Sequence, residues 1–416
     1  MEVRDASAGY ALQVDMPVVP EGYKQTEVGV IPEDWEVKKL GELANFRTGP
    51  FGSALHKSDY TTGCVPVINP MHIVGSKLKP TVTMTITEAA ASKLFEFRLQ
   101  HNDIVIGRRG DMGRCAVVSK NHAGWLCGTG SMIVRPSATI NPDFLQRILT
   151  TSEVISKIEN ASVGSTMINL NQATLSNLYV QRPSLKEQRA IATALSDVDA
   201  LLEALDRLIA KKRDIKQATM QQLLTAQTRL PGFAGHWEIK QLGELLTICH
   251  GRNQRDVEVK DGPFPILATG GKIGTAKQPL YAGPSVLIGR KGTINKPQYM
   301  AGPFWTVDTL FYSIIEGENK AKFLYYRLLM IDWMQYNEAS GVPSLNARTI
   351  ESIEIPCPEP AEQLAIAAVL SDMGTEIEAL EQRRTKTAAL KQAMMQELLT
   401  GRTRLVGLQV GAEAGE

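Results

Sequence analysis

Apolar residues recur at alternating steps of three and four positions in two long segments of this chain, Glu187–Leu230 and Glu362–Leu405. The first segment carries this stripe at Ile191, Ala194, Val198, Leu201, Leu205, Leu208 and Ile215, with Leu195, Leu202 and Ile209 widening it. The second carries it at Ile366, Leu370, Met373, Ile377, Leu380, Leu390, Met394 and Leu398. This heptad spacing predicts two long amphipathic helices. Pro183 and Pro358 mark the expected starts of the two helices, and Gly232 and Gly401 mark their expected ends.

The two segments are copies of one another. They align without a gap, and about half of the aligned residues are identical. The repetition extends upstream of the helices, because Trp35–Leu43 returns as Trp237–Leu245. Weaker echoes follow in the same order, with Ile106–Gly110 against Ile288–Gly292, Phe144–Leu145 against Phe323–Leu324 and Leu170–Asn171 against Leu345–Asn346. Order is kept while spacing drifts, which is typical of a duplicated domain whose loops have diverged.

The apolar stripe of each helix is the most obvious partner for the stripe of the other. We therefore expect the two helices to form an antiparallel coiled coil within one chain. A helix of about 44 residues spans on the order of 66 Å, at roughly 1.5 Å per residue. Such a pair would hold the two globular halves at a fixed separation, related by a pseudo-twofold axis. The alternative is that each helix packs separately onto its own globule.

The remaining chain is rich in short β-type runs broken by Gly, Pro and Asn. Strands are expected at Val65–Asn69, Ile104–Gly107 and Met132–Val134, and at Pro265–Ala268, Val286–Gly289 and Leu310–Ile315. Further helices are expected at Pro142–Asn160 and Asn319–Tyr336. The predicted fold class is therefore α+β, with two tandem α/β domains separated by the long helices. The expected boundaries are 1–20 for an N-terminal extension, 21–182 and 231–358 for the two domains, 183–230 and 359–405 for the helical spacers, and 406–416 for a tail.

Composition predicts a soluble protein whose cysteines are reduced. The chain of 416 residues is 43% hydrophobic and 21% charged, enough to bury the cores of two or three domains. It has no apolar run of about eighteen residues and no signal-peptide pattern, so we expect a cytoplasmic location and no membrane partner. The five cysteines lie far apart without a Cys-x-x-Cys pair, which indicates reduced, mostly buried thiols rather than a disulfide framework or a zinc site.

A net charge of +1 does not by itself indicate nucleic-acid binding. The charge is unevenly distributed, however, because Lys and Arg outnumber Asp and Glu between Asn45 and Arg182 and, more weakly, between Thr247 and Pro358. Positive charge thus gathers in the two globular domains, where a surface that faces phosphates would need it.

Polar, basic loops punctuated by glycine occur at matching places in both domains. Arg and Lys suit guanine and phosphate, Asn and Gln suit adenine, and small residues let a backbone approach a groove. The candidate DNA-binding residues are Arg47, Thr48, Phe51, Ser53, Arg108, Arg109 and Arg114 in the first domain, and His250, Arg252, Asn253, Gln254, Arg290, Lys291, Asn295 and Lys296 in the second. For any single residue the alternative is an ordinary solvent-exposed loop, and it is the recurrence in both domains that favours a DNA surface.

No catalytic or metal-binding motif is evident. The sequence lacks a phosphate-binding loop of the Gly-x-x-x-x-Gly-Lys type, a Gly-x-Ser-x-Gly elbow and a His-Glu-x-x-His motif, and its six histidines are scattered. Asn69–His72 only faintly resembles the loop of amino-methyltransferases, and Glu258-Val-Lys260 lacks the distant acid of a nuclease site. We therefore expect no catalytic residue, no metal site and no cofactor bound by this chain.

As a set, these residues resemble the specificity subunit of type I restriction-modification systems. The resemblance covers nearly the whole chain from about Glu21. Its carriers are Thr26–Trp35, the Gly49–Ser53 loop, the Glu-Gln pairs that end at Gln188 and Gln363, and the Leu-Leu-Thr-x-x-Thr-Arg-Leu segments Leu223–Leu230 and Leu398–Leu405.

The resemblance implies two target-recognition domains that each read one part of a bipartite, asymmetric DNA sequence, with the paired helices setting the gap between the parts. It also implies catalytic partners: two methyltransferase subunits that use S-adenosylmethionine to methylate adenine N6, and translocating endonuclease subunits that use ATP and Mg²⁺. The repeated helices are the expected contact with these partners, through Leu195, Leu202, Leu223, Leu224, Leu370, Ile377, Leu398 and Leu399. The competing hypotheses are a coiled-coil structural adaptor and a DNA methyltransferase or nuclease that acts alone.

Overall fold

The computed structural model describes residues 19–51, 54–110, 112–161 and 169–405. The chain divides into two compact units. Unit 1 holds Met1–Leu202 together with Lys386–Glu416, and unit 2 holds Glu203–Thr385. The two longest helices, α6 (Leu185–Leu224) and α10 (Pro360–Leu399), each contribute one part to unit 1 and the other part to unit 2. The compact units therefore cut across the helical segments that the sequence presents as separate spacers.

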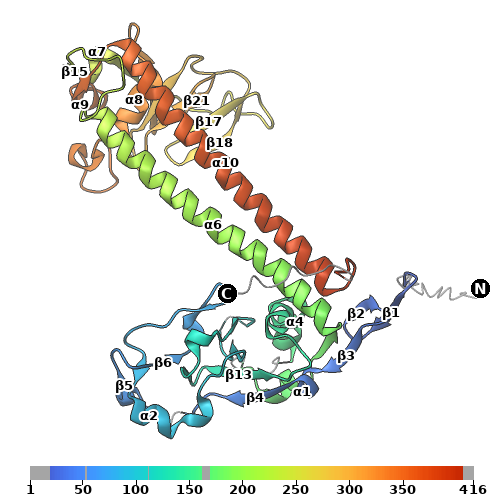
Figure 1. Cartoon of the computed structure of the whole chain (residues 1–416). Helices are drawn as coiled ribbons and strands as arrows, with labels where there is room; N and C mark the ends of the chain where they lie inside the picture. The colour runs from blue at the N-terminus through green and yellow to red at the C-terminus, as the bar shows by residue number, and fades with distance from the viewer. Residues whose placement is uncertain (1–18, 52–53, 111, 162–168, 406–416) are drawn as a thin grey trace, which may run out of the picture. The chain divides into compact units, whose positions relative to one another are not determined.

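Unit 1 is built around two four-stranded sheets. The first has the order β11-β10-β13-β4 and the second the order β12-β6-β9-β5, while β3 pairs with β14, β1 with β2 and β7 with β8. The strands are β1 Tyr23–Thr26, β2 Gly29–Pro32, β3 Glu36–Lys39, β4 Ala44–Thr48, β5 Tyr60–Thr61, β6 Val65–Ile68, β7 Ile73–Val74, β8 Lys77–Leu78, β9 Thr85–Ile86, β10 Ile104–Gly107, β11 Cys115–Val117, β12 Leu126–Cys127, β13 Ser131–Pro136 and β14 Tyr179–Arg182. The short helices are α1 Leu40–Leu43, α2 Glu88–Lys93, α3 Pro142–Leu149, α4 Ser152–Asn160 and α5 Gln172–Ser176. Figure 1 shows these elements.

Unit 2 repeats the same plan with fewer residues. Its sheets have the orders β16-β22-β19-β20 and β18-β17-β21, and β15 pairs with β23. The strands are β15 Glu238–Gln241, β16 Leu246–Cys249, β17 Phe264–Ala268, β18 Gly271–Ala276, β19 Ser285–Gly289, β20 Gln298–Met300, β21 Trp305–Thr306, β22 Leu310–Ile315 and β23 Glu354–Cys357. The short helices are α7 Leu242–Leu245, α8 Ala321–Leu328 and α9 Ala347–Glu351. In both units the second sheet contains one parallel pair, β12 with β6 and β21 with β17. The two halves that repeat in sequence thus also repeat in the order and direction of their strands.

All six predicted strands are confirmed, but the two predicted short helices are not continuous. The segment expected as one helix from Pro142 to Asn160 breaks between α3 and α4. The Thr150 and Thr151 hydroxyls bind the carbonyls of Arg147 and Ile148, and Thr151 adopts an extended backbone in which it caps α4. Such side-chain bonds to the preceding turn compete with helix continuation. In unit 2, α8 ends at Leu328 and only a 3-10 turn, Trp333–Tyr336, follows.

A buried glutamate fixes the start of each long helix. In unit 1 the Glu187 carboxylate accepts hydrogen bonds from Trp35 Nε1 at 3.1 Å and from Arg404 Nε at 2.7 Å. In unit 2 the Glu362 carboxylate accepts from Trp237 Nε1 at 3.0 Å and from Arg229 Nε at 2.6 Å. The repeated Trp, Glu-Gln and Thr-Arg-Leu motifs therefore meet at one point in each unit.

The glutamine after each of these glutamates ties a second helix to the same place. Gln188 Oε1 accepts the backbone N–H of Asn141 at 2.7 Å, directly before α3. Gln363 Oε1 accepts the backbone N–H of Lys320 at 2.9 Å, directly before α8. Both glutamines are buried, so these bonds form away from water. The Glu-Gln pair thus locks the long helix to the globule through two different elements.

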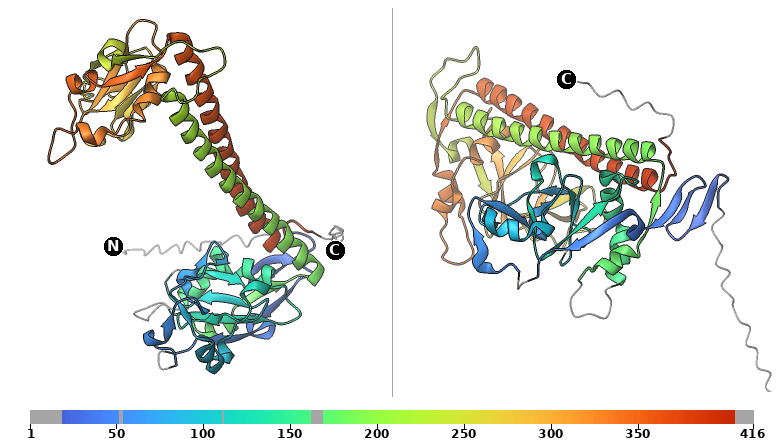
Figure 2. Two further views of the ribbon diagram at one scale, coloured as in Figure 1. Left: turned by 60° about the vertical axis from the view of Figure 1, so that its left-hand side comes forward. Right: turned by 60° about the horizontal axis from the view of Figure 1, so that its bottom comes forward.

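Within each unit, α6 and α10 lie side by side (Figures 1 and 2). In unit 1, Asp199 of α6 pairs with Lys391 of α10 at 2.6 Å. In unit 2, Lys212 pairs with Glu376 at 2.6 Å and Asp206 with Arg384 at 2.9 Å. Residues early in α6 thus meet residues late in α10, and later ones meet earlier ones, so the helices run in opposite directions where they touch.

The helix ends are part of the globular cores. Ile191 and Leu195 of α6 pack with Leu398 and Leu399 of α10 in the main core of unit 1. In unit 2 the corresponding core combines the end of α6, at Met220, Leu223 and Leu224, with the start of α10, at Ile366, Ala367 and Leu370. Each globule is therefore closed by the end of one long helix and the beginning of the other.

Candidate nucleic-acid interface

The candidate loops meet at one edge of the four-stranded sheet in unit 1. Strands β4 and β10 both run antiparallel to β13, which lies between them, so they are parallel to each other. Thr48 lies opposite Met132, and Gly107 lies opposite the neighbouring Ser131. The two strands therefore end at the same level, about 10 Å apart, which is two strand spacings. The loops that carry Phe51 and Arg109 thus leave the sheet side by side.

Unit 2 places its loops in the same way. Strands β16 and β19 flank β22, and both run antiparallel to it. Cys249 lies opposite Tyr312, and Gly289 lies opposite Leu310. The loop that begins at His250 and the loop that begins at Arg290 therefore also leave one sheet edge together. Sequence order alone could not show this, because the relevant strands are far apart along the chain.

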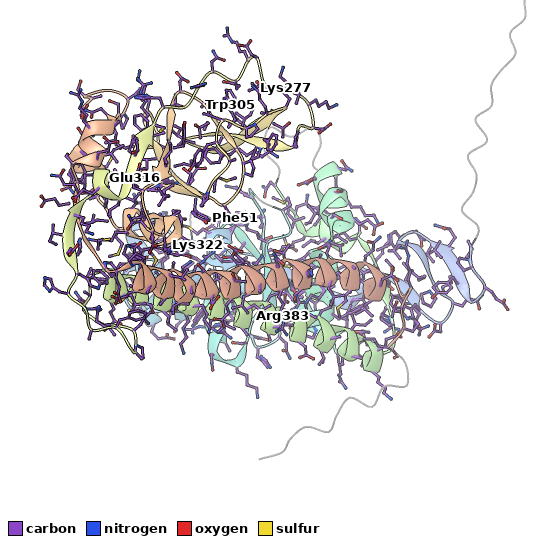
Figure 3. The ribbon with its side chains drawn as sticks, turned by 90° about the horizontal axis from the view of Figure 1, so that it is seen from above. Phe51, Lys277, Trp305, Glu316, Lys322 and Arg383 are labelled. Atoms are coloured by element: carbon purple, nitrogen blue, oxygen red, sulfur yellow. The ribbon has the colours of Figure 1, made fainter. Side chains whose placement is uncertain are left out.

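In each unit a glycine shortly after the first of these two strands lets the loop backbone pass close to another segment of the same chain. A Cβ on Gly49 would lie 1.9 Å from the carbonyl oxygen of Gly128, and a Cβ on Gly251 would lie 2.0 Å from that of Val307. No side chain fits in either place. In unit 1, Phe51 follows shortly after this glycine and is 68% accessible; it is labelled in Figure 3. Ser53, which the sequence also nominates, lies outside the described residues.

The corresponding loop of unit 2 is held by its backbone and presents its side chains to solvent. Arg252 N–H donates to the Thr306 carbonyl at 2.9 Å, and the Trp305 indole donates to the Arg252 carbonyl at 2.9 Å. Asn253 Oδ1 accepts the N–H of Arg255 at 3.0 Å. The Arg252 and Asn253 side chains are exposed, while Gln254 is half-buried. A fixed backbone with an exposed guanidinium is suited to contact an anionic ligand.

Arg47 and Thr48 of unit 1 bind partners within the chain. Arg47 Nη1 forms an ion pair with Glu96 at 2.5 Å, and its guanidinium lies 6.0 Å from the centre of the Phe97 ring. Thr48 Oγ1 accepts a hydrogen bond from Gln172 Nε2 at 3.1 Å. Glu96 and Gln172 carry no motif that would have associated them with this site, so sequence reasoning missed them.

Arg108 is a correction to the predicted set. Its side chain is buried, its Nε donates to the Leu170 carbonyl at 2.9 Å, and burial lowers the pKa of its guanidinium. The Leu170 N–H donates in turn to the Arg108 carbonyl at 2.9 Å. Arg108 therefore fastens the Leu170 segment to the end of β10 and is not extended toward a ligand. In unit 2 the Leu345 N–H makes the same backbone bond to Arg290, whose half-buried side chain donates to the Asp308 carbonyl at 3.2 Å.

The remaining candidates lie on the surface. These are Arg109 and Arg114 in unit 1, and His250, Lys291, Asn295 and Lys296 in unit 2. The His250 ring packs against Phe311 with the ring centres 5.0 Å apart. Each unit therefore offers basic side chains at one sheet edge, joined by amide side chains in unit 2, and the residues differ between the two units.

The residues predicted to contact partners need correction. Leu195, Leu223, Leu224, Leu370, Ile377, Leu398 and Leu399 are all buried in this chain, and Leu202 is half-buried. Leu195, Leu398 and Leu399 fill the core of unit 1 and Leu223, Leu224 and Leu370 that of unit 2, so these buried side chains are not available to another protein. The large exposed apolar residues of α6 are instead Leu201, Leu208 and Ile215, at 40%, 38% and 42% accessibility.

Within the described ranges, no three His, Cys, Asp or Glu side chains gather as a metal site would require. Among these same residues no helix is long and apolar enough to cross a membrane. Of the five thiols, Cys115, Cys127 and Cys357 are buried, Cys249 is half-buried and Cys64 is exposed. Burial raises the pKa of the Cys115 thiol to about 12, so it is present as the unreactive thiol.

Solved structures share this fold. The crystal structure of a type I restriction-modification system S subunit from M. genitalium matches 88% of this chain and 96% of its own, with a TM-score of 0.60 at 17% identity. A chain from a structural study of the assembly and conformational transition of the type I restriction-modification system matches 90% of this chain and 99% of its own, with a TM-score of 0.54 at 16% identity.

Curated relatives agree along nearly the full length. The putative type I restriction enzyme MjaX specificity subunit of Methanocaldococcus jannaschii is 24% identical, over 92% of this chain and 97% of its own. The MjaVIII specificity subunit from the same organism is 21% identical, over 93% and 97%. Neither comparison favours a structural adaptor or an enzyme that acts alone. The family model for the type I restriction modification DNA specificity domain matches residues 32–212 and 235–389, and the chain therefore belongs to this family of DNA-specificity subunits.

Proposed function

We propose that the two globules of this chain read the two parts of a bipartite, asymmetric DNA target for a type I restriction-modification complex. The observation that carries the proposal is the repeated sheet edge, where the loops after β4 and β10 and those after β16 and β19 emerge in pairs. Arg and Lys suit guanine and phosphate, and Asn suits adenine. Because the residues at the two edges differ, the two parts of the target differ as well.

The long helices form an antiparallel coiled coil that sets the gap between the two parts. Four ion pairs between α6 and α10 support this arrangement, and so does the repetition of the Trp, Glu and Arg cluster in each unit, which fits a pseudo-twofold relation. Each helix has 40 residues. At roughly 1.5 Å per residue, each spans on the order of 60 Å.

Catalysis comes from partner subunits in the cytoplasm. Two methyltransferase subunits supply S-adenosylmethionine chemistry at adenine N6, and endonuclease subunits use ATP and Mg²⁺ to translocate and cut DNA. The exposed stripe of α6, formed by Leu201, Leu208 and Ile215, is the surface to which a partner helix docks. Residues seven apart share one helix face, as such an apolar contact requires.

Mapping of methylated adenines in cells with and without this chain tests the DNA-reading function. The expected result is one bipartite motif, two short specified sequences separated by a fixed gap, that loses methylation when the chain is removed. Restoring the unmodified chain should restore the motif. An unchanged set of methylated adenines in cells that express the partner subunits would contradict the proposal.

Substitution of the exposed basic residues tests the assigned sheet edge. Arg252→Ala should weaken binding to the mapped duplex by about 1–3 kcal/mol if the guanidinium contacts a base, and Lys296→Ala should mainly reduce the salt dependence. Arg255→Ala is the matched control outside the predicted set. Equal losses on specific and random duplex for Arg252→Ala would assign this residue to phosphate contact instead.

Two charges placed on the exposed stripe test partner docking. Leu208→Glu combined with Ile215→Glu should abolish co-purification with the methyltransferase subunit while the melting temperature stays within a few degrees, because both positions are exposed. Ala210→Glu combined with Gln217→Glu adds the same charge about half a turn away on exposed positions of the same helix. Equal loss in both pairs would argue against the stripe.

A further inference from the structure

The internal repeat matches four positions at which each globule meets the long helices. In unit 1 they are Arg147 of α3, Ser196 and Asp199 of α6, and Lys391 of α10. In unit 2 the matching positions are Tyr326 of α8, Ser371 and Gly374 of α10, and Lys216 of α6. The serine and the lysine are the same in both units. The other two positions have changed together, from Arg and Asp to Tyr and Gly.

In unit 1 one carboxylate joins three helices. Asp199 Oδ2 lies 2.6 Å from Arg147 Nη1, and Asp199 Oδ1 lies 2.6 Å from Lys391 Nζ. Arg147 Nη2 also donates to Ser196 Oγ at 3.3 Å, and its side chain is only 10% exposed. The globule is thus fixed to the helix pair by two ion pairs that share Asp199.

In unit 2 an aromatic ring takes the place of these ion pairs. Tyr326 is buried, its hydroxyl lies 3.4 Å from Ser371 Oγ, and Lys216 Nζ lies 5.5 Å from the centre of its ring. A lysine over an aromatic face is attracted by the ring quadrupole. Burial is the main reason that the pKa of Lys216 is lowered, with Lys322 adding to it and Glu378 opposing it.

Gly374 completes this second arrangement. A Cβ at this position would lie 2.9 Å from Lys216 Nζ, so the glycine leaves the space that the ammonium group occupies against α10. Glycine is disfavoured inside a helix, yet α10 carries Gly374 in its interior. The matching position in α6 is Asp199, whose carboxylate instead reaches the lysine of the other helix.

We propose that these four positions are positioning residues that match each globule to its own end of the helix pair, and that the two sets are not interchangeable. An arginine in place of Tyr326 would face Lys216 without a carboxylate between them. A globule transferred to the other end would therefore not be held in its native orientation. The consequence for the gap between the two parts of the target rests on the DNA-reading function proposed above.

Single and double variants in unit 2, compared by their unfolding equilibrium constants in the full chain, test directly whether the four positions match. Tyr326→Arg should raise the unfolding equilibrium constant at least tenfold, and Gly374→Asp in the same chain should recover most of that factor. Gly374→Asn with Tyr326→Arg is the matched control, because it adds a side chain of nearly the same size and helix propensity as Asp without a carboxylate. Equal recovery by Asp and Asn would overturn the proposal.

If Tyr326→Arg prevents folding, the reciprocal pair in unit 1 gives the same test. Asp199→Gly should raise the unfolding equilibrium constant because it leaves Arg147 and Lys391 without their shared partner. Arg147→Tyr in the same chain should recover part of this loss, whereas Arg147→Met, which removes the charge without an aromatic ring, should recover less. Equal effects of Tyr and Met would again overturn the match.

The positioning role has a readout that simple loss of stability does not move. At a temperature where all variants are folded, the ratio of affinities for duplexes with the native gap and with a gap one base pair longer should fall at least threefold in Tyr326→Arg. It should return in the double variant with Gly374→Asp. An unchanged ratio would overturn the positioning role. An unmodified chain that binds duplexes with either gap equally well would refute the proposed function. The stability measurements would still test whether the four positions match, because they do not depend on DNA binding.

Discussion

The indole N–H of Trp35 donates to a carboxylate oxygen of Glu187 over 3.1 Å, and that carboxylate is 2% exposed. Arg404 binds the same carboxylate through Nε at 2.7 Å and Nη2 at 2.9 Å. A core residue near the start of the first globule, the first turn of α6 and a residue beyond α10 are thereby joined at one buried charge. Trp237, Glu362 and Arg229 repeat this arrangement in unit 2.

Removal of the arginine should expose the importance of this buried charge. Arg404→Ala leaves the Glu187 carboxylate buried without a cation, which should lower the free energy of unfolding of unit 1 by about 2–4 kcal/mol, below the usual range because Arg404 is 23% exposed. Arg402→Ala is the matched control, since Arg402 is 59% exposed and lies 3.8 Å from Glu397. It should change the free energy by less than about 0.5 kcal/mol. Urea denaturation of the two variants compares them.

Asp34 should make part of this stability depend on pH. Its hydrogen bond to Arg404 is the main cause that lowers the pKa of its carboxyl below the usual 3.8. A lowered folded-state pKa gives a contribution that is complete above the unfolded value and is lost as pH falls through the folded value. The difference in unfolding free energy between the unmodified chain and Asp34→Asn should therefore shrink below pH 3.8. A difference that stays constant down to pH 2 would contradict this.

Gly251, the second residue of the candidate loop of unit 2, should be intolerant of any side chain. Gly251→Ala places a Cβ 2.0 Å from the Val307 carbonyl oxygen, which forces the backbone to shift and should destabilise unit 2 by about 1–3 kcal/mol. Binding of the mapped duplex should weaken as well, because Arg252 follows directly. Gly270→Ala, with nothing within 4 Å, should change stability by less than about 0.5 kcal/mol. Thermal unfolding and a binding titration measure the two effects.

Release of Arg47 from Glu96 should strengthen the electrostatic part of DNA binding. The two side chains are 48% and 51% exposed and 2.5 Å apart, so Arg47 is free to turn to a phosphate when the carboxylate is removed. Glu96→Gln should steepen the dependence of log affinity on log salt by about 1. Glu88→Gln removes the same charge from a pair with Arg98 and is the control. Equal slopes for the two variants would count against a role for Arg47.

The sequence predicts those parts of the fold that depend on local pattern. The runs Ile104–Gly107 and Leu310–Ile315 are strands with the predicted bounds, since a short buried apolar run has few other uses. The break after α3 was missed because it depends on two hydroxyls, those of Thr150 and Thr151, that bind backward along the helix. Threonine is common enough in helices that its presence alone does not signal a break.

The sequence did not predict which apolar face of the long helices is buried. Steps of three and four residues allow two overlapping stripes on α6, one through Leu201, Leu208 and Ile215 and one through Leu195, Leu205 and Ile209. The structure buries the second stripe and exposes the first. Both stripes are apolar, so the sequence pattern did not distinguish the helix face that is buried within this chain from the face that is exposed.

The site was predicted as a set of loops and not as a surface. The matching glycines and basic residues identify the loops, but the order of strands in the sheet decides that the loops of β4 and β10 emerge together. Arg108 could not be separated from Arg109 by sequence, because its burial depends on Leu170, which lies 62 residues away. Such contacts between distant segments are decided by the tertiary fold.

The make-up of the two units has a consequence for synthesis. Unit 2 is one continuous stretch, Glu203–Thr385, whereas unit 1 also requires Lys386 onward, including Arg404. A ribosome therefore delivers everything that unit 2 needs before the last turns of α10 reach the first globule. Until then the core of the first globule lacks Leu398 and Leu399, which pack into it in the folded chain. A premature stop codon just before Lys386 would spare the second globule and leave the first one unfinished.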